Sequence, residues 1–531
     1  MTHEDPSVAR LCEGLDDAWD EAMSTWADFL LLRAPEVVTD GAIAWIDLKT
    51  RQVSVNAHLV AEGRLWHCLP AIFAHEIGHH LRHPATLEVQ ARLILLGRSL
   101  WPGKVDTVVV NLFADYLINR ELGEKFRTEF CDIYRSGGRS GEPAPPAVFF
   151  LSLFEETWKL APGTLTGDGL ESLEREFPGA LFEARRLVYE LRGREPEPDL
   201  HFIRFASAIA RFIDDPEWLA LYACGGPGEP SADDWSAAVA PTASEKNAVD
   251  RALAEGRITK EQADRAMRGL RVDLVPPELR AEALDLLYRR AAQRYLVRLT
   301  SNERRPEEPL VPGTIEPWEM GDSVAHIDWV STSMRGGLST GTPEKRERLP
   351  DEEDARTRPP LLVEIYLDVS GSMPSPDEEV NAMTLSAIIV AISAVRAKAK
   401  VRGVMYSNHA TVLDWSRSVS KLCRFFLSRS GGGTNFPFDL LEESLSRHRG
   451  VLRVIISDLD FVQNVSDGRT AQGTLRRAVE SGLAVVLHSF EGELPTELQR
   501  LGIRVVMVDD ASNLPAAAAK LASSLFSGRT K

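Results

Sequence analysis

The stretch LPAIFAHEIGHHLRH, residues 69–83, decides how the N-terminal part of this 531-residue chain is interpreted. Its apolar residues predict a helix from about residue 65 to 82, which ends before the proline that follows because proline cannot continue a helix. In that helix His75 and His79 lie one turn apart on the same face, so both imidazoles can bind one metal ion. Glu76 lies beside them and can act as a general base toward water. The stretch therefore predicts a metal centre with a neighbouring base.

A catalytic zinc ion needs three protein ligands, so a third ligand must come from elsewhere in the chain. The apolar run 105–122 carries Asn111, Asp115 and Asn119 four residues apart, which places three polar side chains on one line of a buried helix. Buried polar groups need partners, so this line should face something polar or charged. Asp115 is the predicted third ligand, and the two asparagines are predicted to support the ligands by hydrogen bonds. The rival ligands that stay open are other carboxylates and histidines near the motif: Glu88, Asp106, Glu121, His80 and His83.

The segments around this motif have simple predictions. Residues 7–33 have the apolar spacing of an amphipathic helix, and residues 86–100 predict a second helix after the motif. Residues 41–56, GAIAWIDLKTRQVSVN, predict a hairpin because β-branched and aromatic residues flank a polar centre. Two interpretations of this hairpin stay open, a strand that pairs with the backbone of an extended substrate and an ordinary edge hairpin.

Composition excludes several classes of protein. The net charge of −17 argues against a general nucleic-acid or anionic-membrane binder, because phosphate binding needs clustered positive charge. The N-terminus lacks a signal-peptide pattern and no apolar run is long enough for a membrane helix, so we expect a cytoplasmic protein. The five cysteines are scattered without CxxC spacing, which suggests neither a disulfide framework nor a cysteine zinc site.

Length and composition shifts predict a multidomain chain. We expect an α-rich, metal-binding domain over residues 1–135, a boundary of linker composition at 136–146 and a helical middle region over 147–300. Residues 301–358 have the composition of a linker, and residues 359–531 alternate between strand and helix patterns.

The C-terminal segment predicts an α/β doubly wound fold. Apolar strand candidates separated mostly by helical stretches indicate a mostly parallel sheet that is covered on both faces. The candidates span residues 361–368, 401–407, 451–458, 483–490 and 503–509. Sheets of this type bind ligands at the carboxyl ends of their strands.

Oxygen-bearing side chains lie where these strands end. The sequence DVSGS after the first strand offers Asp368, Ser370 and Ser372, and later loops offer Thr434 and Asp458. Carboxylate and hydroxyl oxygens suit a hard ion such as Mg²⁺. The sequence therefore predicts a second metal site, for magnesium.

These motifs carry a resemblance to known families. The DxSxS motif with a distant threonine and aspartate resembles the metal-ion-dependent adhesion site of von Willebrand factor A domains, which have a Rossmann-like fold and bind protein partners through Mg²⁺. The stretches 53–80 and 111–122, with GGGTNF and ISDLDF, resemble bacterial HExxH metallopeptidases of zincin type that are fused to such a domain. The resemblance covers about residues 40–125 and 360–510.

That resemblance implies zinc at His75, His79 and Asp115, with Glu76 as the general base. It further implies a partner of the MoxR-type AAA ATPase class, since members are associated with such ATPases. The chain itself has no GxxxxGK[ST] loop, so ATP hydrolysis would come from the partner. Two hypotheses follow: a zinc peptidase that acts on a protein substrate, or a non-catalytic metal-binding adaptor that works through its C-terminal domain.

Overall fold

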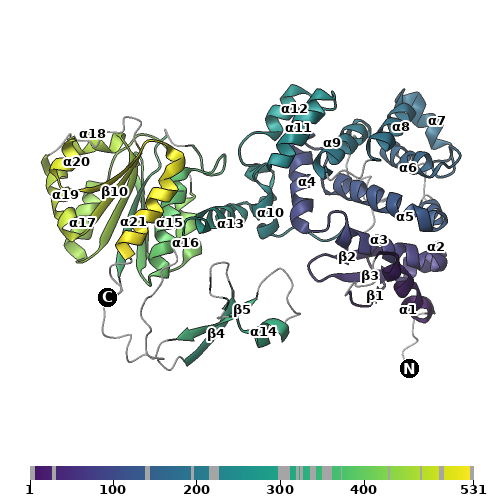
Figure 1. Cartoon of the computed structure of the whole chain (residues 1–531), viewed down its shortest axis with the longest axis horizontal. Coiled ribbons are helices and arrows are strands. Elements are labelled where there is room, and N and C mark those ends of the chain that lie inside the picture. Colours follow the sequence, from purple (N-terminus) through teal and green to yellow (C-terminus); the bar gives the residue numbers. More distant parts are fainter. Residues whose placement is uncertain are drawn as a thin grey trace. The chain divides into compact units, whose positions relative to one another are not determined.

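The computed structural model places most of the chain. It describes residues 6–26, 32–137, 144–192, 197–213, 226–296, 311–318, 322, 324, 327–334, 343–349, 361–371, 374–428, 431–466, 469–488 and 496–526. The chain divides into two compact units, with the boundary between Pro276 and Pro277 (Figure 1). Each unit is described by itself.

The N-terminal unit combines a small sheet with many helices, as predicted. Its three strands lie in the order β1-β3-β2, with β1 parallel and β2 antiparallel to β3, so the predicted hairpin of residues 41–56 is confirmed. The elements of this part are α1 (Pro6–Trp26), β1 (Glu36–Val38), β2 (Ala44–Asp47), β3 (Gln52–Asn56), α2 (Ala57–Gly63), η1 (Trp66–Cys68), α3 (Leu69–Leu81), α4 (Leu87–Leu100) and α5 (Thr107–Gly137).

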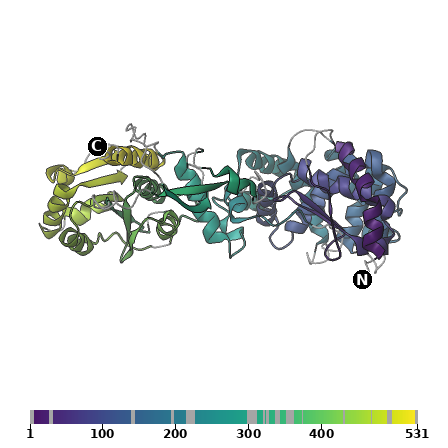
Figure 2. The ribbon, with the colours of Figure 1, turned by 90° about the horizontal axis from the view of Figure 1, so that it is seen from below.

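Helix α3, which carries the HExxH motif, is the centre of this unit. It packs against α1, the purple helix of Figure 2, and also against α5 and β2. Its surroundings bury every residue from Ala71 to His79, which explains why the motif is embedded in apolar sequence. The indole Nε1 of Trp26, the last residue of α1, donates a hydrogen bond of 2.7 Å to the carbonyl of Ala74. The predicted first helix extends to residue 33; residues 27–31 lie outside the described residues, and residues 32 and 33 are not helical, so the prediction is wrong at that end.

The helices that follow α5 form a layered bundle. Capping boxes start α10, α11 and α12, since in each case the N-cap residue before the helix and the third helical residue exchange hydrogen bonds. The elements are α6 (Pro145–Trp158), α7 (Gly169–Glu176), α8 (Ala180–Glu190), α9 (Pro198–Ile209), η3 (Ala210–Phe212), α10 (Ala232–Ala238), α11 (Ala243–Ala254), α12 (Lys260–Ala266) and η5 (Val272–Leu274). The helical character predicted for this region is confirmed.

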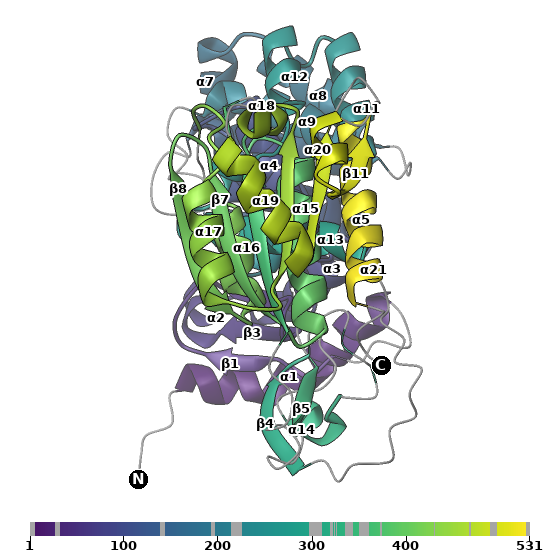
Figure 3. The same cartoon turned by 90° about the vertical axis from the view of Figure 1, so that its left-hand side faces the viewer.

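The C-terminal unit contains a mixed, mostly parallel sheet, as the strand pattern predicts. Its order is β11-β10-β9-β6-β7-β8, and only β8 at one edge runs antiparallel to its neighbour (Figure 3). Helices α15, α16 and α21 cover one face, and α17, α18 and α19 cover the other. The sheet strands are β6 (Leu362–Asp368), β7 (Lys400–Tyr406), β8 (Ala410–Ser416), β9 (Leu452–Asp458), β10 (Leu483–His488) and β11 (Arg504–Val508).

Five strands of this sheet coincide with predicted ones, and β8 was not predicted. Its burial is low along its whole length because it is an edge strand, so it lacks the apolar run that marks the others. The helices of this unit are α13 (Arg280–Gln293), α15 (Ala382–Arg396), α16 (Val419–Phe426), α17 (Phe438–Arg447), α18 (Asp460–Ser466), α19 (Arg469–Ser481), α20 (Thr496–Arg500), η8 (Ala511–Asn513) and α21 (Leu514–Phe526).

The predicted middle region, residues 147–300, is divided between the two compact units. Helices α6 to α12 of the predicted middle region belong to the first unit, whereas α13 belongs to the second and packs on α15 and α16. The predicted linker 301–358 contains an antiparallel pair, β4 (Val311–Pro317) with β5 (Glu344–Leu349), and α14 (Trp329–Met334). The division into four segments itself stays a prediction.

Candidate metal centre

Helices α3 and α5 bring three metal-ligating side chains together. The Nε2 atoms of His75 and His79 lie 3.1 Å apart, and the Oδ1 atom of Asp115 lies 3.4 Å from the first and 3.2 Å from the second. All three side chains are buried. Among the described residues they are the one group of three or more His, Cys, Asp or Glu side chains close enough to hold a metal ion. His75 and His79 lie one turn apart on α3, and Asp115 belongs to the polar line on α5, as the sequence predicts.

A glycine in the motif allows the two helices to approach this closely. A Cβ atom added at Gly78 would lie 2.6 Å from Cγ2 of Ile118, well inside the carbon–carbon contact distance of ~3.5–4.0 Å. Ile118 lies on α5 three residues after Asp115, so the contact is next to the ligand. The small residue inside the motif therefore sets the distance between the histidines and the aspartate.

Hydrogen bonds on the far side of each ring define which histidine nitrogen faces the centre. The Nδ1 atom of His75 lies 2.6 Å from Oδ1 of Asn119, and Nδ1 of His79 lies 2.8 Å from the carbonyl oxygen of His83. Both partners are acceptors, so Nδ1 carries the proton in each neutral ring and each Nε2 presents a lone pair to the centre. Two nitrogen lone pairs and a carboxylate oxygen thus converge on one point.

This donor set suits zinc. Tetrahedral zinc with bonds of ~2.0–2.1 Å requires ligand atoms about 3.3 Å apart, and the three separations here are 3.1, 3.2 and 3.4 Å. Two imidazoles and one carboxylate are a ligand set found in catalytic zinc sites. Burial by itself raises the pKa of Asp115, but without a metal ion the protonated forms of His75 and His79 outweigh burial through hydrogen bonds and charge and bring the pKa to about 2. Asp115 is therefore an anion that attracts a cation.

Glu76 lies beside the three ligands and is fully buried. Neither of its carboxylate oxygens accepts a hydrogen bond of normal geometry from the described residues, although the backbone of Ile46 on β2 favours the ionised form. Burial is the main cause that raises the pKa of Glu76, and the carboxylate of Asp115 adds to the rise. A buried carboxylate without a hydrogen-bond partner needs an explanation, and a role in proton transfer supplies one.

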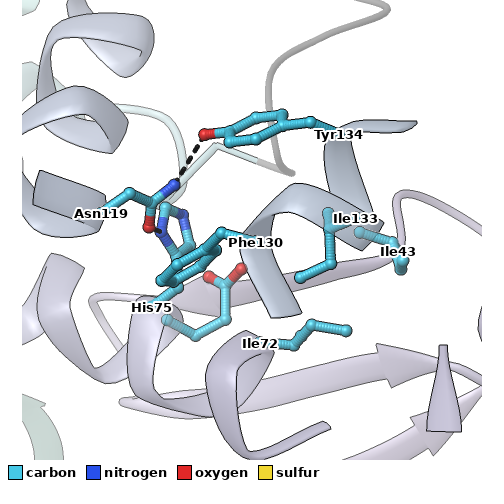
Figure 4. A pocket seen from close by; sticks show the side chains of 8 residues that line it. Ile43, Ile72, His75, Asn119, Phe130, Ile133 and Tyr134 are labelled. Carbon is cyan, nitrogen blue, oxygen red and sulfur yellow. Dashed lines mark hydrogen bonds between the residues drawn. The ribbon is translucent and has the colours of Figure 1, made fainter. Parts of the chain in front are cut away.

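A small cavity adjoins Glu76 and His75 (Figure 4). Its volume is about 20 Å³, which is room for about one water molecule. Most of the wall is apolar, and Asn119 and Tyr134 complete it. The other lining residues are Ile43, Ile72, Phe130 and Ile133.

Of the two asparagines predicted to support the metal ligands, one contacts a ligand and the other does not. Asn119 contacts His75 as predicted, whereas Asn111 forms no hydrogen bond with the three ligands in the described part of the chain. Asn111 lies instead beside Gly226, where an added Cβ would come within 2.7 Å of its Nδ2 atom. The predicted supporting role of Asn111 is therefore not seen, because its helical turn faces a different segment. Tyr134, which was not predicted, accepts a hydrogen bond of 2.8 Å from Nδ2 of Asn119.

The rival ligands lie outside the cluster. Asp106 binds Arg98, and Glu121 lies 3.4 Å from Arg82. Glu88 is exposed, and His80 is not among the grouped side chains. His83 contributes its carbonyl oxygen, and burial lowers the pKa of its imidazole to about 4.

The second predicted site lies at the carboxyl edge of the C-terminal sheet. Asp368 and Asp458 end the neighbouring parallel strands β6 and β9, and Ser370 follows on the loop after β6. The amide of Gly371 donates to the carbonyl of Gly432 at 2.8 Å, which joins this loop to the loop that carries Thr434. Ser372 lies outside the described residues.

Asp368 is held in place by its neighbours. Its Oδ1 accepts from the amide of Ser370 at 3.0 Å, and its Oδ2 accepts from the hydroxyl of Ser457 at 2.6 Å. Burial raises the pKa of Asp368, and the nearby carboxylate of Asp458 raises it further. Two carboxylates at one sheet edge, with hydroxyl groups beside them, form a set of oxygen atoms that a hard cation could bind.

Comparisons with known proteins add little. No protein-family model matches the sequence, and no curated protein matches it. Among solved structures, the chain is similar to a von Willebrand factor type A protein from Catenulispora acidiphila at 16% identity and a TM-score of 0.25, over 32% of this chain and 43% of that one. It is similar to the conserved hypothetical protein BatB from Bacteroides thetaiotaomicron at 17% identity and a TM-score of 0.23, over 31% of this chain and 98% of that one. Within the described residues, no helix has the length and apolar character needed to cross a membrane.

Proposed function

We propose that this chain is a zinc-dependent peptidase in which His75, His79 and Asp115 hold the metal and Glu76 is the general base. The observation that carries the proposal is the convergence of two histidine nitrogens and one carboxylate at zinc spacing, beside a buried glutamate whose carboxylate accepts no hydrogen bond of normal geometry from the described residues. A purely structural cluster has no need for that glutamate. The proposal extends to a protein substrate and to a cytoplasmic location.

The chemistry needs each of these groups in a defined role. Zinc, when bound, polarises the scissile carbonyl and lowers the pKa of water toward ~7. Glu76 accepts a proton from the attacking water and passes it to the leaving amine, a role that the raised pKa of its buried carboxyl favours. Strand β2 pairs with β3 on one side, so its other edge, which includes Ile46 near Glu76, offers backbone groups to an extended peptide.

The test compares wild type with Glu76→Gln, which keeps the size of the side chain and removes the base. We expect zinc content to stay the same and hydrolysis of unfolded proteins to fall by about 10²–10⁴-fold, the usual contribution of a general base. Glu88→Gln, at an exposed position of α4, is the matched control and should keep full activity. Zinc-loaded wild type that hydrolyses no faster than Glu76→Gln, even with an ATPase partner present, would refute the proposal.

For the C-terminal unit we propose a von Willebrand A-like domain that binds Mg²⁺ and a protein partner. Its strand order with one antiparallel edge strand and the oxygen groups of Asp368, Ser370, Thr434 and Asp458 near one sheet edge support this. Ser372 would complete the set. The partner supplies an acidic side chain to the ion, and the class of partner we propose is a MoxR-type AAA ATPase.

A second candidate function is favoured by the burial of the zinc centre. Glu76 is 0% and His79 is 1% exposed, and the adjoining cavity has room for about one water molecule, not for a peptide. A buried centre is also what a structural metal site in a non-catalytic adaptor would have. The adaptor predicts that Asp368→Ala abolishes partner binding, that Asp439→Ala at an exposed position does not, and that Glu76→Gln has no biological effect. Loss of function in the Glu76 variant alone would rule out the adaptor.

A further inference from the structure

Helix α5 consists of two helical parts that meet at Phe126. The backbone of Phe126 has φ −115° and ψ 29°, which is outside the helical range, so the direction of the helix changes there. The first part carries Asp115 and Asn119. The second part, residues 127–137, carries Phe130, Ile133 and Tyr134, which form one wall of the cavity beside Glu76 (Figure 4).

Two hydrogen bonds connect this second part to a ligand of the metal centre. Oδ1 of Asn119 lies 2.6 Å from Nδ1 of His75, and Nδ2 of Asn119 donates to the hydroxyl oxygen of Tyr134 at 2.8 Å (Figure 4). The amide has an acceptor end and a donor end, so its orientation fixes the proton on His75. With the oxygen toward His75, the ring carries its proton on Nδ1 and Nε2 is available to a metal ion. With the amide reversed, Nε2 would carry the proton and could not bind one.

The hydroxyl of Tyr134 accepts a hydrogen bond from the amide nitrogen in the orientation present and so holds the side chain of Asn119 against His75. The ring of Tyr134 is anchored independently, with centroids 5.0 Å from Phe154, 6.4 Å from Phe150 and 6.4 Å from Trp158. Removal of the hydroxyl alone therefore leaves the packing of the second part in place. The hydrogen bond between Asn119 and Tyr134 can therefore be removed without loss of the fold.

We infer that Tyr134 is a positioning residue, whose hydroxyl acts through Asn119 to hold His75 ready for the metal and so couples metal binding to closure of residues 127–137 over the centre. The coupling is reciprocal: metal that orders His75 stabilises the closed second part of α5, and opening of that part loosens the metal. Phe130, Ile133 and Tyr134 restrict a cavity that has room for about one water molecule, so movement of this wall would widen the path of a peptide to Glu76. The covering segment is then a control point for substrate entry.

This inference rests on the metal-binding part of the proposed function and is independent of peptide hydrolysis. The test uses the full chain as wild type, as Tyr134→Phe, and as Tyr189→Phe, an equal change at a tyrosine of α8 that is 74% exposed. Zinc affinity is measured by competition with a chelator. Hydrogen exchange of peptides from residues 127–137 is measured with and without zinc.

We expect about tenfold weaker zinc binding in Tyr134→Phe, the low end of the range for groups that orient metal ligands, and no change in Tyr189→Phe. Zinc should slow exchange in residues 127–137 of wild type, and this protection should be smaller in Tyr134→Phe. Equal zinc affinity in the two proteins, or equal protection by zinc, overturns the inference and leaves the proposed function intact. Wild type that binds no zinc overturns the proposed function, and this inference with it.

Discussion

The close approach of α3 and α5 makes Gly78→Ala the most informative single change. The added Cβ would lie 2.6 Å from Cγ2 of Ile118, so one of the two helices must move by about 1 Å to restore a carbon–carbon contact of ~3.5–4.0 Å. Ile118 cannot easily turn away, because it is fully buried and a β-branched side chain in a helix has one strongly preferred rotamer. Overpacking of this kind costs about 1–3 kcal/mol.

Two opposing effects give the net magnitude. Alanine is a better helix former than glycine by about 1 kcal/mol, so the variant is expected to be destabilised by at most about 2 kcal/mol in the absence of zinc. A shift of about 1 Å between the helices also exceeds the roughly 0.2 Å tolerance of a metal–ligand bond, so zinc affinity should fall by tenfold or more. Gly14→Ala is the matched control, since no atom lies within 4 Å of its added Cβ. The control should gain up to about 1 kcal/mol and keep its zinc affinity.

The assay measures local stability and zinc affinity in the N-terminal unit. Hydrogen exchange of α3 peptides, measured against urea concentration in the zinc-free chain, reports the local free energy of opening, and chelator competition reports zinc affinity. The close approach of the helices predicts opposite changes in stability for the two alanine variants. A Gly78→Ala variant that is as stable as Gly14→Ala and binds zinc as wild type does would refute the claim that this glycine sets the ligand spacing.

Three further predictions follow from buried groups. Asp115→Asn should lower zinc affinity by more than about 100-fold, because it removes a direct ligand; unchanged zinc content would mean that one of the rival residues is the ligand. Arg453→Met should destabilise the C-terminal unit in urea unfolding by less than the about 3–5 kcal/mol of an unpaired buried charge, because fully buried Glu364, 3.2 Å from Arg453, loses one partner and keeps Arg402. Alkylation at pH 8 followed by peptide mass spectrometry should label exposed Cys12 and spare Cys68, since burial shields the Cys68 thiol and raises its pKa to about 12, which disfavours the reactive thiolate.

Much of the candidate site follows from local patterns. The spacing of His75, Glu76 and His79 within an apolar run was sufficient to place them on one buried helix, and the spacing of four from Asp115 to Asn119 placed both on one line of another. The five apolar strand candidates of the C-terminal unit coincide with strands of the sheet, because buried parallel strands are apolar throughout and this is visible in the local sequence. Edge strand β8 was not predicted, since exposure removes that signal.

Other features could not be predicted because they depend on which elements meet. Asn111 has the same spacing from Asp115 as Asn119, but only Asn119 contacts His75, and no local rule distinguishes the two. Tyr134 gave no signal, because its place beside the cavity depends on the change of helix direction at Phe126. A residue 15 positions from Asn119 reaches it only through that change.

The sequence by itself determined the chemistry that is available: two histidines and a glutamate on one helix, a buried aspartate on another, and oxygen ligands at the ends of parallel strands. These features depend on the 3.6-residue and two-residue periods, which are properties of neighbouring residues. Only the tertiary structure decided that Gly78 lets the two helices approach, that three ligand atoms converge at 3.1–3.4 Å, and that Phe130, Ile133 and Tyr134 line the cavity beside Glu76. These depend on packing between segments far apart in the chain, where shape complementarity and not periodicity selects the contact.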